Sequence, residues 1–176
     1  MGAFSGRHFG MPMAGLLATG LLLAPLVQAG SYPDWQGVPL YGTLNAYADE
    51  SDWMAVIQVR AGGGAAMPEA AGADCQGYVE QAQPDLDLNL RTDEPRDLVI
   101  RLATREPLLI VVYSSERQWV CSSPEEAGGR SQLSLVMDDV SPGNFNIWVG
   151  HRDSDADYPR VDMTVEFRRG EDGLEL

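Results

Sequence analysis

The sequence predicts an all-β domain, an antiparallel β-sandwich or barrel. Apolar residues alternate with polar ones in several short runs, which is the period of a strand with one buried face. Nineteen glycines and eleven prolines supply turns between these runs. No segment keeps the 3.6-residue period of an amphipathic helix. Strands of about six residues joined by short turns are typical of antiparallel sandwiches and barrels.

The expected strands are recognised by their apolar faces. Residues 85–90 alternate strictly, with leucines on one face and acidic or amide side chains on the other. Residues 108–113 are continuously apolar up to a final tyrosine, as expected for a strand covered on both faces, and residues 53–59 form another largely apolar run. Four further sets alternate: Leu98, Ile100 and Leu102; Leu133, Leu135 and Met137; Phe145, Ile147 and Val149; and Val161, Met163, Val165 and Phe167. The Ala/Gly-rich residues 61–73 are expected to form a mobile loop, with a helical turn around Glu69 as the alternative.

The first 29 residues have the pattern of a cleavable signal peptide. A short basic region is followed by apolar residues 11–27, and Val27 and Ala29 place small residues at positions −3 and −1 of a cleavage site. A membrane anchor is the alternative, but Pro12, Gly15, Gly20 and Pro25 interrupt the apolar run. We therefore expect cleavage after Ala29, no stable membrane insertion afterwards, and a periplasmic or secreted protein.

Cys75 and Cys121 are the only cysteines in the sequence. In an exported protein two cysteines are expected to pair as a disulfide. A metal site that uses both is a remote alternative, because they and the one histidine outside the signal peptide are too few for a closed zinc site.

The net charge of −14 limits the partners of this protein. All twelve basic residues are arginines, and the sequence contains no lysine. Such an acidic surface repels phosphate backbones, so no nucleic acid is expected as a partner. The charge suits a salty environment, cations or a basic partner, although solubility alone is a sufficient explanation.

No catalytic residues are expected. A Ser–His–Asp triad needs a histidine as its base, and outside the signal peptide only His151 is present, with no Gly-x-Ser-x-Gly motif to present a nucleophile. We expect His151 to be a surface residue. Asp138 and Asp139 are adjacent, so within a strand they should point to opposite faces and not act on one substrate.

Calcium is the one cofactor that the sequence suggests, and none is expected to be required. Asp153, Asp155 and Asp157 alternate in one loop, where carboxylates can converge on a hard cation that prefers oxygen ligands. Asp138, Asp139 or a backbone carbonyl are candidates to complete the site. An EF-hand is excluded, because a tyrosine and a threonine stand where that loop needs Gly and Glu. A solvated acidic loop is the alternative.

The tryptophans are candidate binding residues, because exposed indole rings often stack on sugars or on partner side chains. Trp119 and Trp148 are the two that we single out. Trp148 lies opposite the face formed by Phe145, Ile147 and Val149, so it belongs either to the outer surface of the sheet or to a second packed layer. A role in the core or in covering the sheet is the favoured alternative for both.

Three stretches resemble the bacterial pre-peptidase C-terminal-like (PPC-like) domains: residues 75–88, residues 118–121 and residues 141–150. The last contains a Pro–Gly turn that leads into the sequence Ile-Trp-Val-Gly. The resemblance implies a jelly-roll-like β-sandwich, export to the periplasm or beyond, and a disulfide between the two cysteines. It also implies an accessory role beside secreted peptidases. Asn146 stands where the family pattern usually has Asp, and Ser122-Ser123 replace an acidic pair.

The expected organisation is a signal peptide over residues 1–29, N-terminal strands and the Ala/Gly-rich loop over 30–74, a PPC-like sandwich over 75–169 and a tail over 170–176. The expected function is that of an exported, non-catalytic binding or accessory module. Its ligand is an extracytoplasmic protein, a glycan or a cation. The alternatives are a secreted, peptidase-associated hydrolase and a structural or stress protein of the cell envelope.

Overall fold

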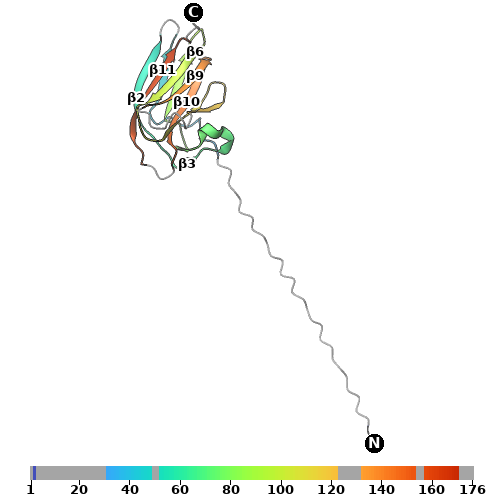
Figure 1. Cartoon of the computed structure of the whole chain (residues 1–176). Coiled ribbons are helices and arrows are strands. Elements are labelled where there is room, and N and C mark those ends of the chain that lie inside the picture. The colour runs from blue at the N-terminus through green and yellow to red at the C-terminus, as the bar shows by residue number, and fades with distance from the viewer. Residues whose placement is uncertain (1, 3–30, 49–51, 123–131, 154–156, 171–176) are drawn as a thin grey trace, which may run out of the picture.

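Two β-sheets pack face to face in the structure, a computed structural model that describes residues 2, 31–48, 52–122, 132–153 and 157–170 (Figure 1). The expected signal peptide lies almost entirely outside these residues. Sheet A contains β1 (Thr43–Tyr47), β3 (Ala65–Ala66), β4 (Tyr78–Val79), β5 (Leu86–Arg91), β7 (Leu108–Tyr113), β8 (Trp119–Cys121) and β10 (Gly143–His151). Sheet B contains β2 (Trp53–Arg60), β6 (Arg96–Leu102), β9 (Leu133–Val140) and β11 (Arg160–Arg168). The predicted all-β sandwich is confirmed.

Strand β10 organises sheet A. On one side it pairs with β7, which in turn pairs with β8, and on the other side it pairs with β5 over residues 143–147 and with β4 at His151. The order in sheet B is β2-β11-β6-β9. All these pairs are antiparallel, as expected, but β1 runs parallel to β5 at the edge of sheet A. A parallel pair needs a long connection, and almost forty residues separate the two strands here.

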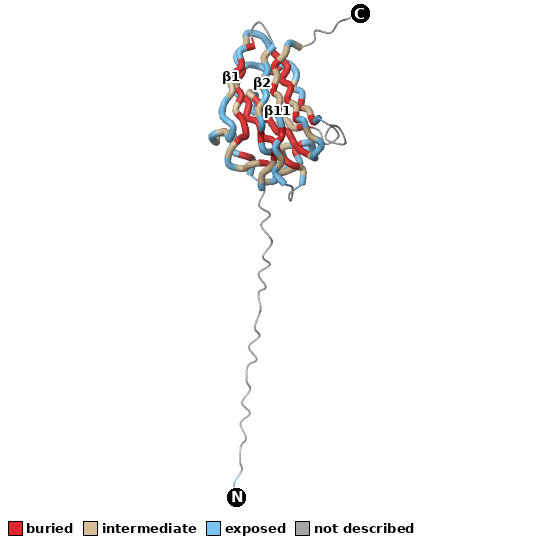
Figure 2. The backbone as a smooth tube through the Cα atoms, turned by 90° about the vertical axis from the view of Figure 1, so that its left-hand side faces the viewer, coloured by how far each residue is buried: buried red, intermediate tan, exposed pale blue. Residues whose placement is uncertain are grey.

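The main hydrophobic core lies between the two sheets. Every alternating apolar set predicted from the sequence points into it, and buried residues recur along most of the longer strands (Figure 2). Leu86 and Leu88 of β5, Phe145 and Ile147 of β10 and Phe167 of β11 have no exposed surface. The periodicity of the sequence therefore identified the inner faces of both sheets.

A second apolar layer covers part of the outer face of sheet A. It is formed by Leu109, Val111 and Trp148 from the sheet and by side chains of residues 65–79, which we call the covering segment. This segment contains β3, β4 and two short 3-10 turns, Glu69–Ala71 and Ala73–Cys75. The Ala/Gly-rich stretch is thus packed in part, with Met67 only 4% exposed, and it contains the helical turn expected as the alternative.

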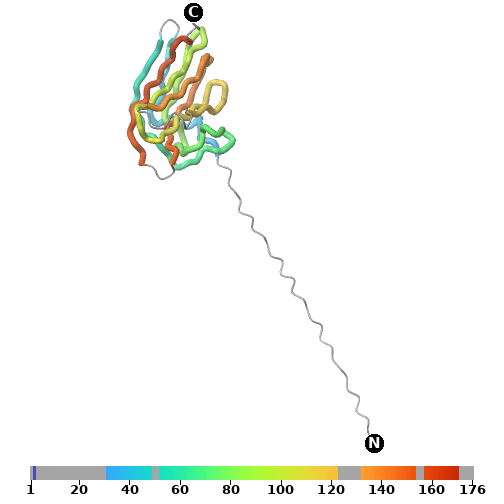
Figure 3. Tube along the Cα trace, in the orientation of Figure 1, coloured from blue at the N-terminus to red at the C-terminus, as the bar shows by residue number. Residues whose placement is uncertain are grey.

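Glycine allows β4 of the covering segment to lie close to β10 within sheet A. A Cβ atom at Gly150 of β10 would lie 2.5 Å from the backbone oxygen of Tyr78 in β4. Any larger residue would separate these two strands. In Figure 3 the green covering segment and the yellow β7–β8 hairpin lie on the same side of the molecule.

A β-bulge interrupts β9 at Asp138 and Asp139. Residue Arg96 of β6 pairs with Val140 and Leu98 pairs with Met137, so two residues of β9 oppose one residue of β6. Asp139 has a positive φ of 51°. Both residues are exposed, and the bulge interrupts the regular alternation from which opposite faces were expected.

Candidate binding face on sheet A

Polar side chains gather on the outer face of sheet A, beside the second apolar layer. Thr43, Asn45 and Tyr47 point outward from β1, since Leu44 and Ala46 between them pack into the core. The same alternation places Asp87 and Asn89 of β5, and two asparagines of β10, on the outer face. We call the resulting group the amide face: Asn45, Asp87, Asn89, Asn144 and Asn146.

Strand register brings these residues side by side. Asn89 of β5 pairs with Asn45 of β1 on one side and with Asn144 of β10 on the other. Asn146 pairs with Asp87 in the same way. Neighbouring strands lie about 4.8 Å apart, so Asn45, Asn89 and Asn144 form a row across three strands, and Asn146 and Asp87 form a shorter row across two.

Side-chain hydrogen bonds connect each row. Asn89 donates from Nδ2 to Oδ1 of Asn45 at 3.2 Å, and Asn144 donates from Nδ2 to Oδ1 of Asn89 at 2.9 Å. In the second row Asn146 donates to Asp87 at 2.6 Å. Burial raises the pKa of Asp87 above its usual value, and the hydrogen bond from Asn146 opposes this shift. These bonds hold the amide planes in fixed orientations.

The composition of the amide face conflicts with local strand preference. Asn and Asp are depleted in β-strands because they are short, polar and turn-forming. Here five of them occupy paired positions on neighbouring strands. Places where such a local rule is broken are expected at functional or strained sites.

Aromatic rings border the amide face. Tyr113 of β7 pairs with Asn146, and the ring of Trp35 lies against Tyr113 with ring centroids 5.3 Å apart. Trp35 remains 40% exposed. Next to them Trp119 lies 4.8 Å from Tyr113 and is covered on its other side by Tyr32, stacked at 5.3 Å. The half-exposed rings therefore continue the surface on which the amides lie.

The two expected tryptophans differ in their surroundings. Trp148 has no exposed surface, and its Nε1 donates to the backbone oxygen of Gln83 at 2.8 Å. A buried ring offers no face to a ligand, so Trp148 belongs to the second apolar layer. Trp119 is half-buried in the aromatic border, 5.3 Å from Trp148.

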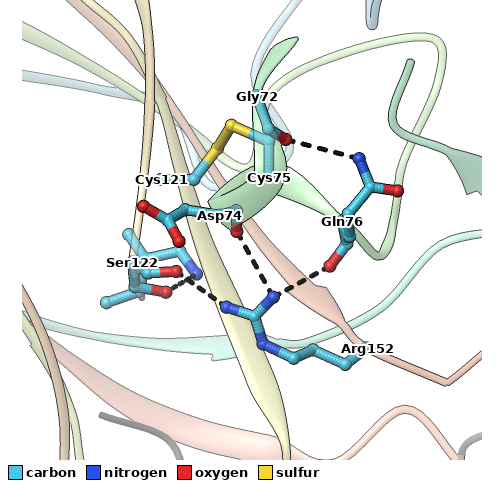
Figure 4. Close-up of a disulfide and its surroundings, with 8 residues drawn as sticks. Gly72, Asp74, Cys75, Gln76, Cys121, Ser122 and Arg152 are labelled. Carbon is cyan, nitrogen blue, oxygen red and sulfur yellow. Dashed lines mark hydrogen bonds between the residues drawn. A yellow bond between two sulfur atoms is a disulfide. The ribbon is translucent and has the colours of Figure 1, made fainter. Parts of the chain in front are cut away.

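The disulfide fastens the covering segment beside this border. Cys75 and Cys121 form the expected bond, with Cα atoms 5.1 Å apart. Arg152 adds hydrogen bonds beside the disulfide. Its guanidinium donates to the backbone oxygens of Asp74 at 3.3 Å, Gln76 at 2.9 Å and Ser122 at 2.7 Å (Figure 4). The cystine and the arginine thus join the same two stretches of chain.

The candidate calcium ligands that the structure describes lie at two opposite ends of β10. Asp153 and Asp157 lie beyond the C-terminal end of β10, and Asp155 is outside the described residues. Asp138 and Asp139 precede the N-terminal end of β10, and the nine residues of that strand span about 26 Å. They cannot complete a site in the 153–157 loop. Within the described parts of the chain, no group of three or more acidic, histidine or cysteine residues is placed to hold a metal ion.

His151 is buried rather than on the surface. It is 6% exposed, and its Nδ1 accepts a hydrogen bond from the backbone N–H of Asp153 at 3.0 Å. The expectation of a surface residue is wrong because His151 ends β10 in a pair with Tyr78 of the covering segment. This placement leaves a substrate little access to the imidazole.

A separate cleft of about 320 Å³ lies near the other edge of the covering segment. Tyr41, Arg60, Glu80 and Tyr158 line it together with the backbone of residues 62–64, and Asp85 is nearly buried beside it. Burial raises the pKa of Asp85 to about 7. The carboxyl of Asp85 is engaged by the backbone of β10, which gives it a structural role.

Sequence reasoning did not identify the amide face as a site. The alternation at residues 85–90 showed that Asp87 and Asn89 face outward, but the pairing with Asn45, Asn144 and Asn146 depends on strand register. The recurrence of Asn at outward positions of expected strands was the signal that could have found it.

Comparison with protein-family models gave no match for this chain, and comparison with curated protein sequences gave none. No helix in the described part of the chain has the length and apolar character needed to span a bilayer. Function therefore has to be inferred from the chemistry of the face.

Proposed function

We propose that the protein is an extracytoplasmic, non-catalytic binding module that holds its ligand on the amide face and its aromatic border. The observation that carries this proposal is the hydrogen-bonded row of Asn45, Asn89 and Asn144, which lies on the same face of the sheet as the half-exposed ring of Tyr113. The ring of Trp35, 40% exposed, lies against Tyr113. The neighbouring Asn146 is buried and supports the face from within. Polar groups fixed in orientation lose little conformational entropy when a ligand arrives, which favours binding.

Two further observations support the proposal. The disulfide is typical of proteins that work in an oxidising compartment outside the cytoplasm. The resemblance to PPC-like domains agrees with an accessory role, and we propose that the chain belongs to that family. A hydrolase gains no support, because the imidazole of His151 is buried.

Retention on the native cell-envelope fraction tests this function. The wild-type protein is expected to co-sediment with the fraction, and Trp35→Ala and Asn89→Ala are expected to weaken retention. Gln58→Ala is the matched control, because it removes an exposed amide from β2 on the opposite sheet. Equal retention of all four proteins would contradict the proposal.

A further inference from the structure

We infer that the ligand of the amide face is a neutral glycan chain that lies across strands β1, β5 and β10, with Trp35 stacking on one of its sugar rings. This inference rests on the proposed function and names the class of ligand for that same face. Four features of the described residues support it: their hydrogen-bonding capacity, their spacing, the aromatic surface beside them and their charge.

The hydrogen-bonding capacity of the face matches sugar hydroxyls. Each side-chain amide carries two N–H donors and one acceptor oxygen, and a hydroxyl can both donate and accept. The row uses one N–H of Asn89 and one of Asn144, together with the oxygens of Asn45 and Asn89. Asn144 and Asn45 are exposed, so the second N–H of Asn144 and both N–H groups of Asn45 point to a surface that solvent reaches.

The spacing of the row suits a polymer of repeating units. Asn45, Asn89 and Asn144 are directly paired across adjacent strands, so the same amide group recurs about every 4.8 Å across the sheet. This repeat is close to the length of one pyranose unit in an extended chain. Successive sugars could therefore meet successive amides without bending of the chain.

The aromatic border supplies the apolar component of sugar binding. One face of a pyranose ring presents C–H groups that pack on an aromatic ring. Trp35 is 40% exposed and is supported from below by Tyr113, which holds its ring in place. Trp119 is half-buried and stacked against Tyr32, so Trp35 is the more accessible of these two tryptophans.

The charge of the face favours a neutral ligand. Four of its five side chains are uncharged amides, and the fifth is Asp87. The protein carries a net charge of −14, which repels acidic polymers. A basic peptide would be attracted by the overall charge, but it would gain little from a row of neutral amides, so we favour the glycan.

The test determines separately which class of ligand is bound and which face of the protein binds it. Envelope fraction is divided into three samples: untreated, treated with periodate, which cleaves vicinal diols, and treated with protease. Wild type, Trp35→Ala, Asn89→Ala and Gln58→Ala are co-sedimented with each. Purified insoluble 1,4-linked neutral glucan and mannan, which carry a vicinal diol in each sugar unit, serve as defined probes, with polygalacturonate as the acidic comparison.

We expect retention to be lost after periodate treatment and to survive protease. We also expect retention on at least one neutral polymer but not on polygalacturonate. The Trp35→Ala and Asn89→Ala proteins should bind about tenfold more weakly, while Gln58→Ala should bind as wild type does.

The remaining outcomes contradict one statement or both. Loss of retention after protease but not after periodate, with weak binding by the two face variants, would overturn the glycan and leave the binding face in place. Selective retention on polygalacturonate would overturn neutrality of the ligand. Retention that is equal in all variants, or absent on every sample, would overturn both the glycan and the proposed function.

Discussion

The carboxylate of Asp85 accepts a hydrogen bond from the backbone N–H of Val149 at 2.6 Å. Val149 belongs to β10, between Ile147, the last residue that pairs with β5, and His151, which pairs with β4. On that side of β10 the N–H of Val149 therefore has no partner from a neighbouring strand. Asp85 fills this gap from a position only 2% exposed. The pKa of Asp85 is raised to about 7, and burial is the largest cause. The hydrogen bond from Val149 opposes this shift, and the nearby charge of Glu80 adds to it.

Asp85 should make the stability of the protein fall as pH rises. Below its ordinary pKa of 3.8 the acid is protonated in both folded and unfolded chains. Between that value and about 7 only the folded protein keeps the proton, so stability falls by up to about 1.4 kcal/mol per pH unit from this group. Above that range the loss is complete and constant.

Urea unfolding of wild type and Asp85→Asn at pH values from 4 to 9 measures this effect. The asparagine keeps an acceptor for Val149 but does not ionise, so the difference in stability between the two proteins should shift in its favour as pH rises to about 7. A difference that is independent of pH would contradict the account.

Reduction of the disulfide should destabilise the protein. The bond joins residues 46 positions apart, and opening so long a loop restores about 3–4 kcal/mol of conformational freedom to the unfolded chain. Thermal unfolding of wild type and of the Cys75→Ser/Cys121→Ser double variant, with and without reductant, measures the effect. Reductant should lower the wild-type midpoint and leave the variant unchanged; a wild-type midpoint that does not move would contradict this prediction.

Arg152 should stabilise the attachment of the covering segment independently of the disulfide. Its guanidinium donates to three backbone oxygens on two separate stretches of chain. Charge-assisted bonds of this kind lead us to expect a loss of about 1.5–3 kcal/mol in Arg152→Ala. Arg152→Lys keeps the charge but lacks the planar fork, so it should recover only part of the loss, measured by urea unfolding of the oxidised proteins. Full recovery by lysine would show that charge alone matters.

The sequence was sufficient to identify the longer strands and the inward faces of those that alternate, because a strand with an apolar side chain at every second residue buries only one of its two faces. The sequence did not identify the short strands β3, β4 and β8. It did not reveal the parallel pairing of β1 with β5, which depends on how distant segments meet. The bulge at Asp139 was equally hidden, since an aspartate in a strand gives no sign of a positive φ. His151 was misplaced because its burial requires β4, a strand of two residues with no periodicity of its own.

The site was harder to predict than the fold. Calcium was suggested by three carboxylates that are close in sequence, yet the residues proposed to complete the site lie at the opposite end of β10. The amides of Asn45, Asn89 and Asn144 are far apart in sequence and meet only through register. Proximity in sequence could not reveal this face, because a face on a sheet is assembled across strands that are distant in the chain.

The triple substitution Asn45→Thr, Asn89→Thr and Asn144→Thr tests the central claim most directly. Threonine has a higher strand preference than asparagine, so residues kept for binding should be replaceable without loss of stability, or with a gain of up to about 1 kcal/mol. We predict an unchanged or higher free energy of unfolding together with loss of retention on the envelope fraction. A clear loss of stability with retention intact would show instead that the amides only hold the sheet together.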